Sequence, residues 1–176
     1  MTEPALIPTV PAEEHERRQR RESSPLGELW DLLDAVKDPE IPAVSLWEMG
    51  ILQDIEMDGE TVRVTITPTY SGCPAMSVMA EDVVTELARA GYRGEVINRL
   101  SPAWSTTWMS AEAQQKLRDW GIAPPGHNCG GEPVQVLCPR CGAAEVKRLS
   151  EFGSTACKAL YQCRACGEPF DHFKPI

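Results

Sequence analysis

The sequence predicts a protein of the α+β class, a small α/β domain followed by a β-rich module that contains paired cysteines. Two observations carry this prediction. Residues 26–100 switch between helical apolar spacing and the period-two alternation of strands, in the order helix, β-hairpin, helix, strand. Residues 138–167 then carry two Cys-x-x-Cys pairs, each followed by glycine. A chain of 176 residues has room for these two units.

The first predicted helix begins at Pro25 with Ser24 as its N-cap, because serine suits the N-cap and proline suits the first helical position. Its apolar residues follow helical spacing up to about residue 37: Leu26, Leu29, Trp30, Leu33 and Val36. The stretch Asp38-Pro39-Glu40-Ile41-Pro42 ends the helix, since each proline disfavours helical geometry in the residue before it.

Three further elements complete the first domain. Residues 51–57 and 60–67 predict a β-hairpin that turns at Asp58-Gly59, a pair typical of tight hairpins. A helix is expected over residues 74–90 and a third strand over residues 95–100.

Cys73 stands between the hairpin and the second helix, in the stretch from Thr67 to Met76. Because a helix N-terminus favours an anion, its thiol is expected to ionise more easily than an ordinary cysteine. Cys73 is therefore a candidate for handling iron or an iron–sulfur cluster, and the alternative is an inert, buried helix cap. Thr67 and Ser71 are candidate hydrogen-bond donors to the thiolate, although such hydroxyls often satisfy backbone groups instead.

The cysteine pattern of the second module predicts a metal centre. Cys138 and Cys141 form one pair, Cys163 and Cys166 form the other, and 21 residues separate the pairs. Two such turns place four thiolates around one tetrahedral metal ion, most often zinc, although the sequence allows iron as well. A closed four-cysteine site has no open coordination position, so its expected role is structural.

Two other cysteines have open roles. Cys157, six residues before Cys163, is either a core residue of the module or an accessory thiol with a redox or docking role. Cys129 follows His127 in a Gly/Pro-rich stretch, where an exposed bystander is favoured over a second metal site.

The charge distribution excludes some classes of partner. Residues 25–130 hold 16 acidic and 7 basic side chains, and residues 131–176 hold 5 acidic and 6 basic ones. With a net charge of −9, nucleic acid is not an expected partner, whereas a protein with basic patches is. No apolar run is long enough to span a membrane, and no secretory signal is visible. Seven cysteines without such a signal suggest the cytoplasm, where thiols stay reduced.

Over residues 26–176 the chain resembles the PaaD family, which belongs to the bacterial phenylacetyl-CoA epoxidase system and whose first module resembles the SufT-type iron–sulfur assembly domain. The matching stretches are Asp38-Pro39-Glu40-Ile41-Pro42 with Ser45, Met49-Gly50-Ile51, Thr67 through Met76, Pro102-Ala103-Trp104, Leu117 through Pro125, and Phe152 through Tyr161. One departure is Glu48-Met49-Gly50, where the assembly domain usually has Asp-Leu-Gly, so the carboxylate sits one methylene further out.

The resemblance implies an iron–sulfur-assembly-type domain followed by a zinc ribbon. It implies that Cys73 is the reactive cysteine of the assembly domain, and that Asp38 and Glu40 line the same face. The alternative for these two carboxylates is turn chemistry, since aspartate before proline ends a helix. We expect a disordered tail over residues 1–24, the assembly domain over 25–105, a helix with a Gly/Pro linker over 106–131, and the four-cysteine ribbon over 132–176.

The chain shows no Ser-His-Asp order, glycine-rich phosphate loop or Glu-x-x-His pair, so it lacks the usual sequence signs of an enzyme. The resemblance implies an accessory factor that matures the metallocentres of the epoxidase, with its oxygenase and reductase subunits as partners. The alternative is a structural adaptor that bridges epoxidase subunits. The sequence leaves open whether the protein forms a homodimer.

Overall fold

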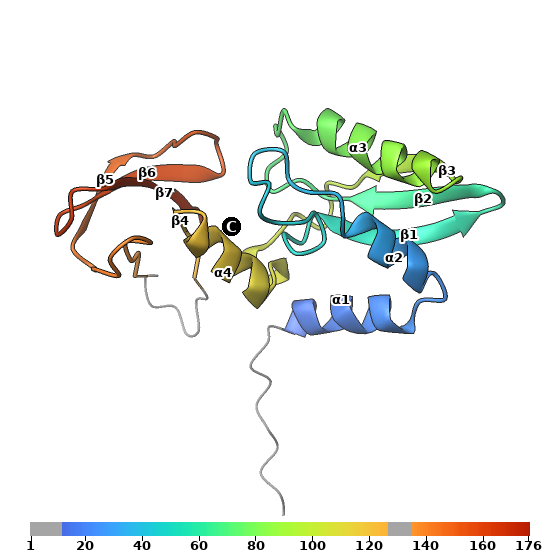
Figure 1. Ribbon diagram of the computed structural model, residues 1–176, viewed down its shortest axis with the longest axis horizontal. Helices are drawn as coiled ribbons and strands as arrows, with labels where there is room; N and C mark the ends of the chain where they lie inside the picture. Colours follow the sequence, from blue (N-terminus) through green and yellow to red (C-terminus); the bar gives the residue numbers. More distant parts are fainter. Residues whose placement is uncertain (1–11, 127–134) are drawn as a thin grey trace, which may run out of the picture.

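The structure is a computed structural model that describes residues 12–126 and 135–176. Figure 1 shows two lobes, with α4 and the C-terminus between them. The larger lobe contains α1 (Ala12–Ser23), α2 (Gly27–Leu33), β1 (Leu52–Asp58), β2 (Thr61–Ile66), α3 (Met76–Arg89), β3 (Arg93–Asn98) and the short 3-10 helix η1 (Thr106–Trp108). The connecting helix is α4 (Ala111–Asp119), and the smaller lobe contains β4 (Ile122–Ala123), β5 (Val146–Ser150), β6 (Lys158–Cys163) and β7 (Pro169–Phe173).

The sheet of the larger lobe has the order β1-β2-β3. β1 and β2 form the predicted antiparallel hairpin, with Asp58 paired to Thr61, so the loop is Gly59-Glu60 rather than Asp58-Gly59. Gly59 takes a φ of 60°, a left-handed geometry that glycine adopts without strain. β3 pairs parallel to β2, and α3 makes the crossover between them.

The predicted helices are present, with shorter bounds. α2 begins at Gly27 instead of Pro25, and α3 begins at Met76 instead of Pro74. The buried face of α3 consists of Met79, Val83 and Leu87, at the four-residue spacing that places side chains on one side of a helix.

Residues 12–23 correct the expectation of a disordered tail, because they form α1. Arg17 anchors this helix: its guanidinium donates to the carbonyl oxygens of Trp108 at 2.7 Å and Leu52 at 2.8 Å. It also lies 4.3 Å from the centre of the Trp47 ring. A charged side chain can be buried when its donors are satisfied in this way, and a mixed-charge sequence gives no sign of such burial. Residues 1–11 lie outside the described residues.

The sheet of the smaller lobe has the order β4-β7-β6-β5. The short segments 134–137, 146–150, 160–162 and 170–173 of this module predict small strands, and the last three match β5, β6 and β7. Two expectations differ. β4 comes from the segment predicted as linker and pairs parallel to β7, whereas residues 135–137 of a fourth predicted strand, 134–137, form none. That segment instead leads directly into the turn of Cys138, whose N–H bonds to the Ala143 carbonyl at 2.9 Å.

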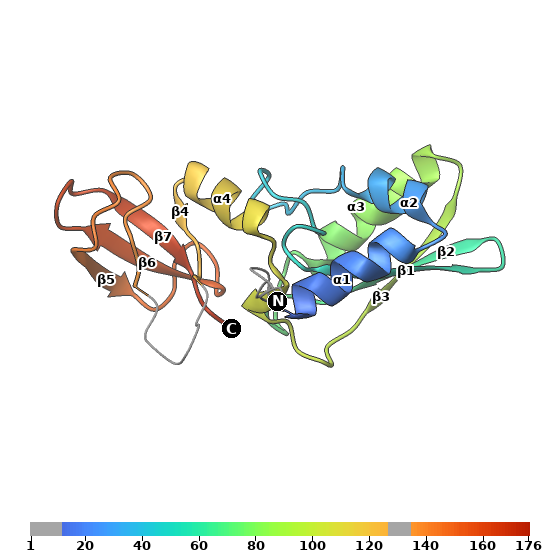
Figure 2. The same cartoon turned by 90° about the horizontal axis from the view of Figure 1, so that it is seen from below.

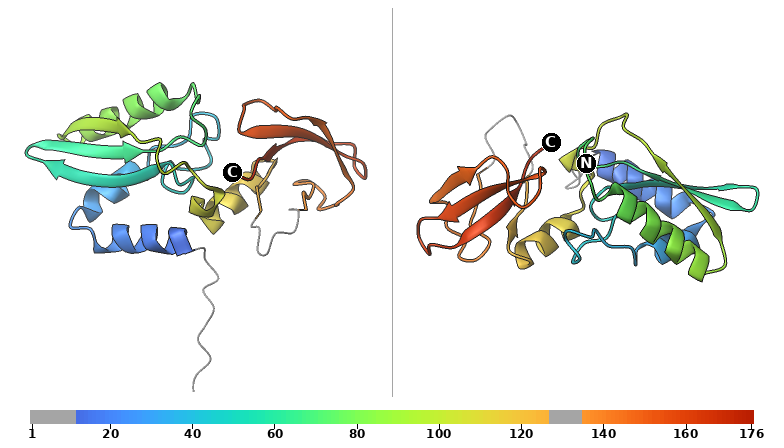
Figure 3. Two further views of the ribbon diagram at one scale, coloured as in Figure 1. Left: turned by 180° about the vertical axis from the view of Figure 1, so that it is seen from behind. Right: turned by 90° about the horizontal axis from the view of Figure 1, so that it is seen from above.

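The two lobes share one hydrophobic core. Cys157 and Phe173 of the smaller lobe are buried together with Trp104 and the core residues of the larger lobe. The C-terminal Ile176 accepts a hydrogen bond from the N–H of Thr106 at 3.0 Å. Figures 2 and 3 show this end of the chain between the lobes from further sides. No helix within the described ranges is long and apolar enough to cross a membrane.

Candidate functional site

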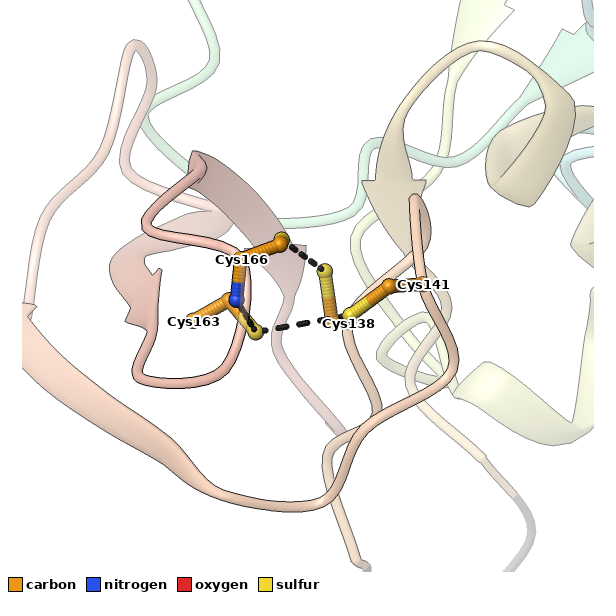
Figure 4. Close-up of side chains that lie close together, drawn as sticks. All are labelled: Cys138, Cys141, Cys163 and Cys166. Atoms are coloured by element: carbon orange, nitrogen blue, oxygen red, sulfur yellow. Dashed lines mark hydrogen bonds between the residues drawn. The ribbon is translucent and has the colours of Figure 1, made fainter.

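The four ribbon cysteines converge on one point (Figure 4). Their sulfur atoms all lie within 4.8 Å of one another. The Cys138 and Cys166 sulfurs are 3.8 Å apart, and those of Cys141 and Cys163 are 3.6 Å apart. These distances are too long for a disulfide, and they match the edge of about 3.8 Å that a tetrahedron with metal–sulfur bonds of ~2.3 Å has. The donor set therefore fits a single tetrahedral metal ion.

Matching turns present the two cysteine pairs. The N–H of Gly142 bonds to the Cys138 carbonyl at 2.9 Å, and the N–H of Gly167 bonds to the Cys163 carbonyl at 3.1 Å. Both glycines have positive φ, 74° and 79°. Glycine is required there because other residues rarely adopt this conformation.

The electrostatics of the cage also fit a cation. Backbone N–H groups, first that of Cys166, lower the pKa of the Cys163 thiol to about 7. A backbone hydrogen bond from Ala143 favours the Cys141 thiolate, yet its neighbours Cys166 and Cys163 raise its pKa to about 12. Without a cation the crowded thiols cannot all ionise together, and a divalent ion would stabilise all four thiolates.

Cys73 lies in the turn before α3 and is half-buried. Burial raises the pKa of its thiol, and although the Ala75 N–H favours the thiolate, Glu40, Asp38 and Cys157 raise the pKa further. The expectation of an easily ionised thiol is therefore wrong. Helix position alone predicts ionisation, but burial, together with the charges of Glu40 and Asp38, outweighs it here.

Asp38 and Glu40 lie close enough to Cys73 for their charges to affect its thiol. Asp38 is buried, and its Oδ1 accepts from the N–H groups of Glu40 at 2.8 Å and Ile41 at 3.0 Å, as in an Asx-turn. Burial raises the pKa of both carboxyls. The Asp38 carboxylate therefore stabilises the turn that follows it, and its charge also affects the Cys73 thiol.

The smaller lobe contributes the other side of this site. The Thr155 hydroxyl favours the ionised form of Glu40 and so lowers its pKa against the effect of burial, and its Oγ1 lies 3.0 Å from the buried Cys157 sulfur. Lys158 is almost fully buried, with its Nζ 3.8 Å from an Asp171 carboxylate oxygen, and its charge reaches Asp38, Glu40 and Cys157. We call Cys73, Cys157, Asp38, Glu40 and Lys158 the Cys73 cluster.

The structure places the remaining predicted residues elsewhere. Ser71 is exposed, and its hydroxyl makes no hydrogen bond to Cys73 within the described part of the chain. Thr67 is buried, but its Oγ1 has no partner among the described residues, and its side chain lines a different cavity with Arg17. Cys129 and His127 lie outside the described residues. Sequence reasoning missed Lys158 and Thr155, for which the only signal was the matching stretch Phe152 through Tyr161.

Comparisons with known proteins match both modules. Residues 27–96 match the family described as iron–sulfur cluster assembly protein, and residues 123–174 match the PaaD zinc beta ribbon domain. Among solved structures, a domain of unknown function from Bacillus anthracis is 27% identical, with a TM-score of 0.48 over 58% of this chain and 95% of that chain. A conserved hypothetical protein from Thermotoga maritima is 24% identical, with a TM-score of 0.45 over 53% of this chain and 94% of that chain.

Two curated proteins are also similar. An Fe-S protein maturation auxiliary factor of Porphyromonas gingivalis is 34% identical over 49% of this chain and 84% of its own length. A protein of Escherichia coli K12, provisionally named as a subunit of 1,2-phenylacetyl-CoA epoxidase, is 44% identical over 85% of this chain and 92% of its own length. With an assembly domain, a PaaD-type ribbon and this overall similarity, the chain belongs to the PaaD family of phenylacetyl-CoA epoxidase subunits.

Proposed function

We propose that this chain is a non-catalytic maturation factor, which receives iron or an iron–sulfur cluster at Cys73 and passes it to the oxygenase or reductase of a phenylacetyl-CoA epoxidase. Two relatives support this proposal. One is named as a subunit of that epoxidase, and the other as an Fe-S protein maturation factor. Neither name states which client protein receives the metal.

The observation that carries the proposal is the Cys73 cluster itself. Two thiols and two carboxylates from separate modules lie within range of one another's charges, and thiolate and carboxylate are both ligands of iron. Among the described residues, the ribbon cysteines form the group whose ligand atoms are placed to hold a metal ion without a further ligand, and the Cys73 cluster does not form such a group. The Cys73 cluster therefore differs from a closed cage, and it suits cargo that a client protein completes and removes.

The positive charge of Lys158 would stabilise iron or a cluster that carries net negative charge when bound at this site. Its buried ammonium is the nearby positive charge that favours the ionised forms of Asp38, Glu40 and Cys157. Iron held by several thiolates, or an iron–sulfur cluster, carries net negative charge, which a buried cation stabilises. Lys158 would therefore lower the cost of loading.

The test is to purify the epoxidase oxygenase and reductase from cells that carry Cys73→Ala, and to measure their iron content and activity. We expect under-metallated, weakly active client proteins, and the same direction for Cys157→Ala. Thr85→Ala is the control, because it truncates one exposed polar side chain of α3 outside the cluster. Fully metallated, active client proteins from the Cys73→Ala cells would overturn the proposal.

A structural adaptor is the second candidate, and one observation favours it. The smaller lobe exposes Phe152 and Leu149, at 63% and 46%, and it packs against the assembly domain through the shared core. Exposed apolar residues of this kind are typical of docking surfaces. Co-purification of the epoxidase subunits decides between the two. Binding that tolerates Cys73→Ala but fails with Cys141→Ser, together with full metallation, would favour the adaptor.

A further inference from the structure

A cavity of about 290 Å³ lies between α1 and the segments that follow β2 and β3. Its wall includes Arg17 and Arg20 from α1, Thr67 from the end of β2, Arg99 from the end of β3, and Trp108 from η1. No member of the Cys73 cluster lines it. The cavity is therefore a separate site from the one that carries the proposed function.

The charge of this cavity is opposite to that of the whole chain. Three arginines and the single acidic residue Glu16 line it, in a protein with a net charge of −9. Arg18 and Arg21 on the same helix pair with carboxylates. The side chains of Arg20 and Arg99, in contrast, form no ion pair within the described ranges, and both are exposed.

Two buried polar atoms of the lining residues also lack partners. Arg17 Nε and Thr67 Oγ1 are inaccessible to solvent and make no hydrogen bond within the described residues. Leaving a buried polar atom without a hydrogen-bond partner costs stability, so such atoms are uncommon unless water or a ligand satisfies them. Burial lowers the pKa of Arg17 to about 10, and the charges of Arg20 and Arg18 lower it further, against the raising effect of Glu14. A nearby anion would offset this effect.

We propose that this cavity binds the phosphate group of a small molecule. The lining residues carry three positive charges and one negative charge, and the net of +2 matches a phosphate monoester dianion better than a monocarboxylate. Arginine forks suit phosphate oxygens, and a threonine hydroxyl is a common additional donor. The ligand is either inorganic phosphate or a phosphorylated metabolite, because both present the same group.

Calorimetric titration of the full chain at constant ionic strength tests this assignment. Inorganic phosphate and glycerol 3-phosphate are the probes, and acetate is the reference anion. We expect both phosphates to bind more tightly than acetate, and the tighter of the two identifies the source. The double variant Arg20→Gln, Arg99→Gln should weaken phosphate binding by about tenfold or more, since it removes two positively charged donors from the exposed side of the cavity.

The matched control is Arg93→Gln, Arg164→Gln, which removes the same total charge from two exposed arginines outside the cavity. It should bind phosphate like the unmodified chain. Thr67→Val, with folding checked by circular dichroism, should weaken binding as well. The proposal would be overturned if phosphate and acetate bound with equal affinity, or if both double variants lost the same phosphate affinity. Either result would mean that the anion is attracted by the overall charge and not by this cavity.

Discussion

The rings of Trp104 and Phe173 pack against each other with their centroids 5.8 Å apart, and this contact joins the two modules. Trp104 is fixed from the other side, because its Nε1–H donates to the Met49 carbonyl at 3.0 Å. Phe173 is 1% exposed. Phe173→Ala would leave a cavity at the junction, and we expect a loss of about 3 kcal/mol or more in the free energy of unfolding, measured by urea denaturation.

The same measurement on Phe152→Ala is the control, since that ring is 63% exposed and its loss should change stability by less than about 0.5 kcal/mol. Phe173→Ala should also make the two modules unfold in separate transitions, because their shared core is broken. A single transition with unchanged stability would show that the modules are held together elsewhere.

Removal of the ribbon metal should disturb the Cys73 cluster, although none of the four cysteines belongs to it. Cys157 directly precedes β6, the strand that ends at the ligand Cys163. Because a metal supplies much of the folding energy of a small module, a strong chelator or Cys141→Ser should unfold the ribbon and expose Cys157. Elemental analysis should give one zinc per chain before treatment, and Cys157 should then react with a thiol reagent. Continued protection of Cys157 after complete metal loss would contradict this coupling.

The alkylation rate of Cys73 should depend on pH in a defined direction. Burial, Glu40, Asp38 and Cys157 raise the pKa of this thiol above its ordinary value of 9.0. The thiolate is the reactive form, so at pH 7–8 iodoacetamide should modify Cys73 more slowly in the folded chain than in urea. The folded rate should approach the unfolded rate only as the pH rises beyond 9.0. Peptide mass spectrometry measures the modification at this residue alone.

Glu40→Gln tests the cause of that shift. Removing this carboxylate removes one of the charges that disfavour the thiolate, so Cys73 should react faster than in the unmodified chain at the same pH. Glu60→Gln, in the exposed hairpin loop, should have no effect. If Cys73 instead reacted faster in the folded chain than in urea, its pKa would be lowered by the helix N-terminus, as the sequence alone predicts.

The sequence was sufficient for the hairpin, for α3 and for the metal centre, because each of these depends on short-range spacing. Apolar periodicity predicted the hairpin and α3 to within two residues at their ends, and the paired cysteines predicted the cage. A period of 3.6 or 2 and a two-residue ligand gap are properties of a few neighbouring residues.

The Cys73 cluster and α1 depend on contacts between distant residues, and for that reason spacing could not predict them. Lys158 lies 85 positions after Cys73, and nothing near it in the sequence distinguishes a buried lysine from a surface one. Likewise, Arg17 is buried only because carbonyl oxygens of Trp108 and Leu52 face it. The pKa of Cys73 was predicted wrongly for the same reason, since it depends first on burial and then on Glu40 and Asp38 from another loop and Cys157 from the other module.

Glu48 stands where the assembly domain usually has aspartate, and hydrogen bonds connect it both to Ser45 of the larger lobe and to α4. Its carboxylate accepts from the Ser45 N–H at 2.9 Å while its own N–H donates to the Ser45 hydroxyl at 3.1 Å, and its other oxygen accepts from Lys116 of α4. The longer side chain therefore closes a capping box and reaches α4 at once. This geometry gives Glu48 a role in joining α4 to the first module.

The pKa of Glu48 follows from these contacts. Burial raises it, but Lys116 and the Ser45 N–H outweigh burial and lower it below the ordinary value of 4.5. Because the unfolded carboxyl then binds its proton more tightly, the stabilisation is complete well above pH 4.5 and is lost as the pH falls through the folded-state pKa. At pH 7, Glu48→Gln should cost about 1 kcal/mol, a modest value because Lys116 is partly exposed.

Urea denaturation of Glu48→Gln and the unmodified chain between pH 3 and pH 8 measures this difference, with Glu60→Gln as a control of equal charge change at an exposed site. The two stability curves should converge at the acidic end, since a protonated glutamate and a glutamine are both neutral. Lys116→Met should remove the same pH dependence from the other partner. A difference that stays constant down to pH 3 would mean that Glu48 acts through its shape rather than its charge, and the interaction with α4 would then not be ionic.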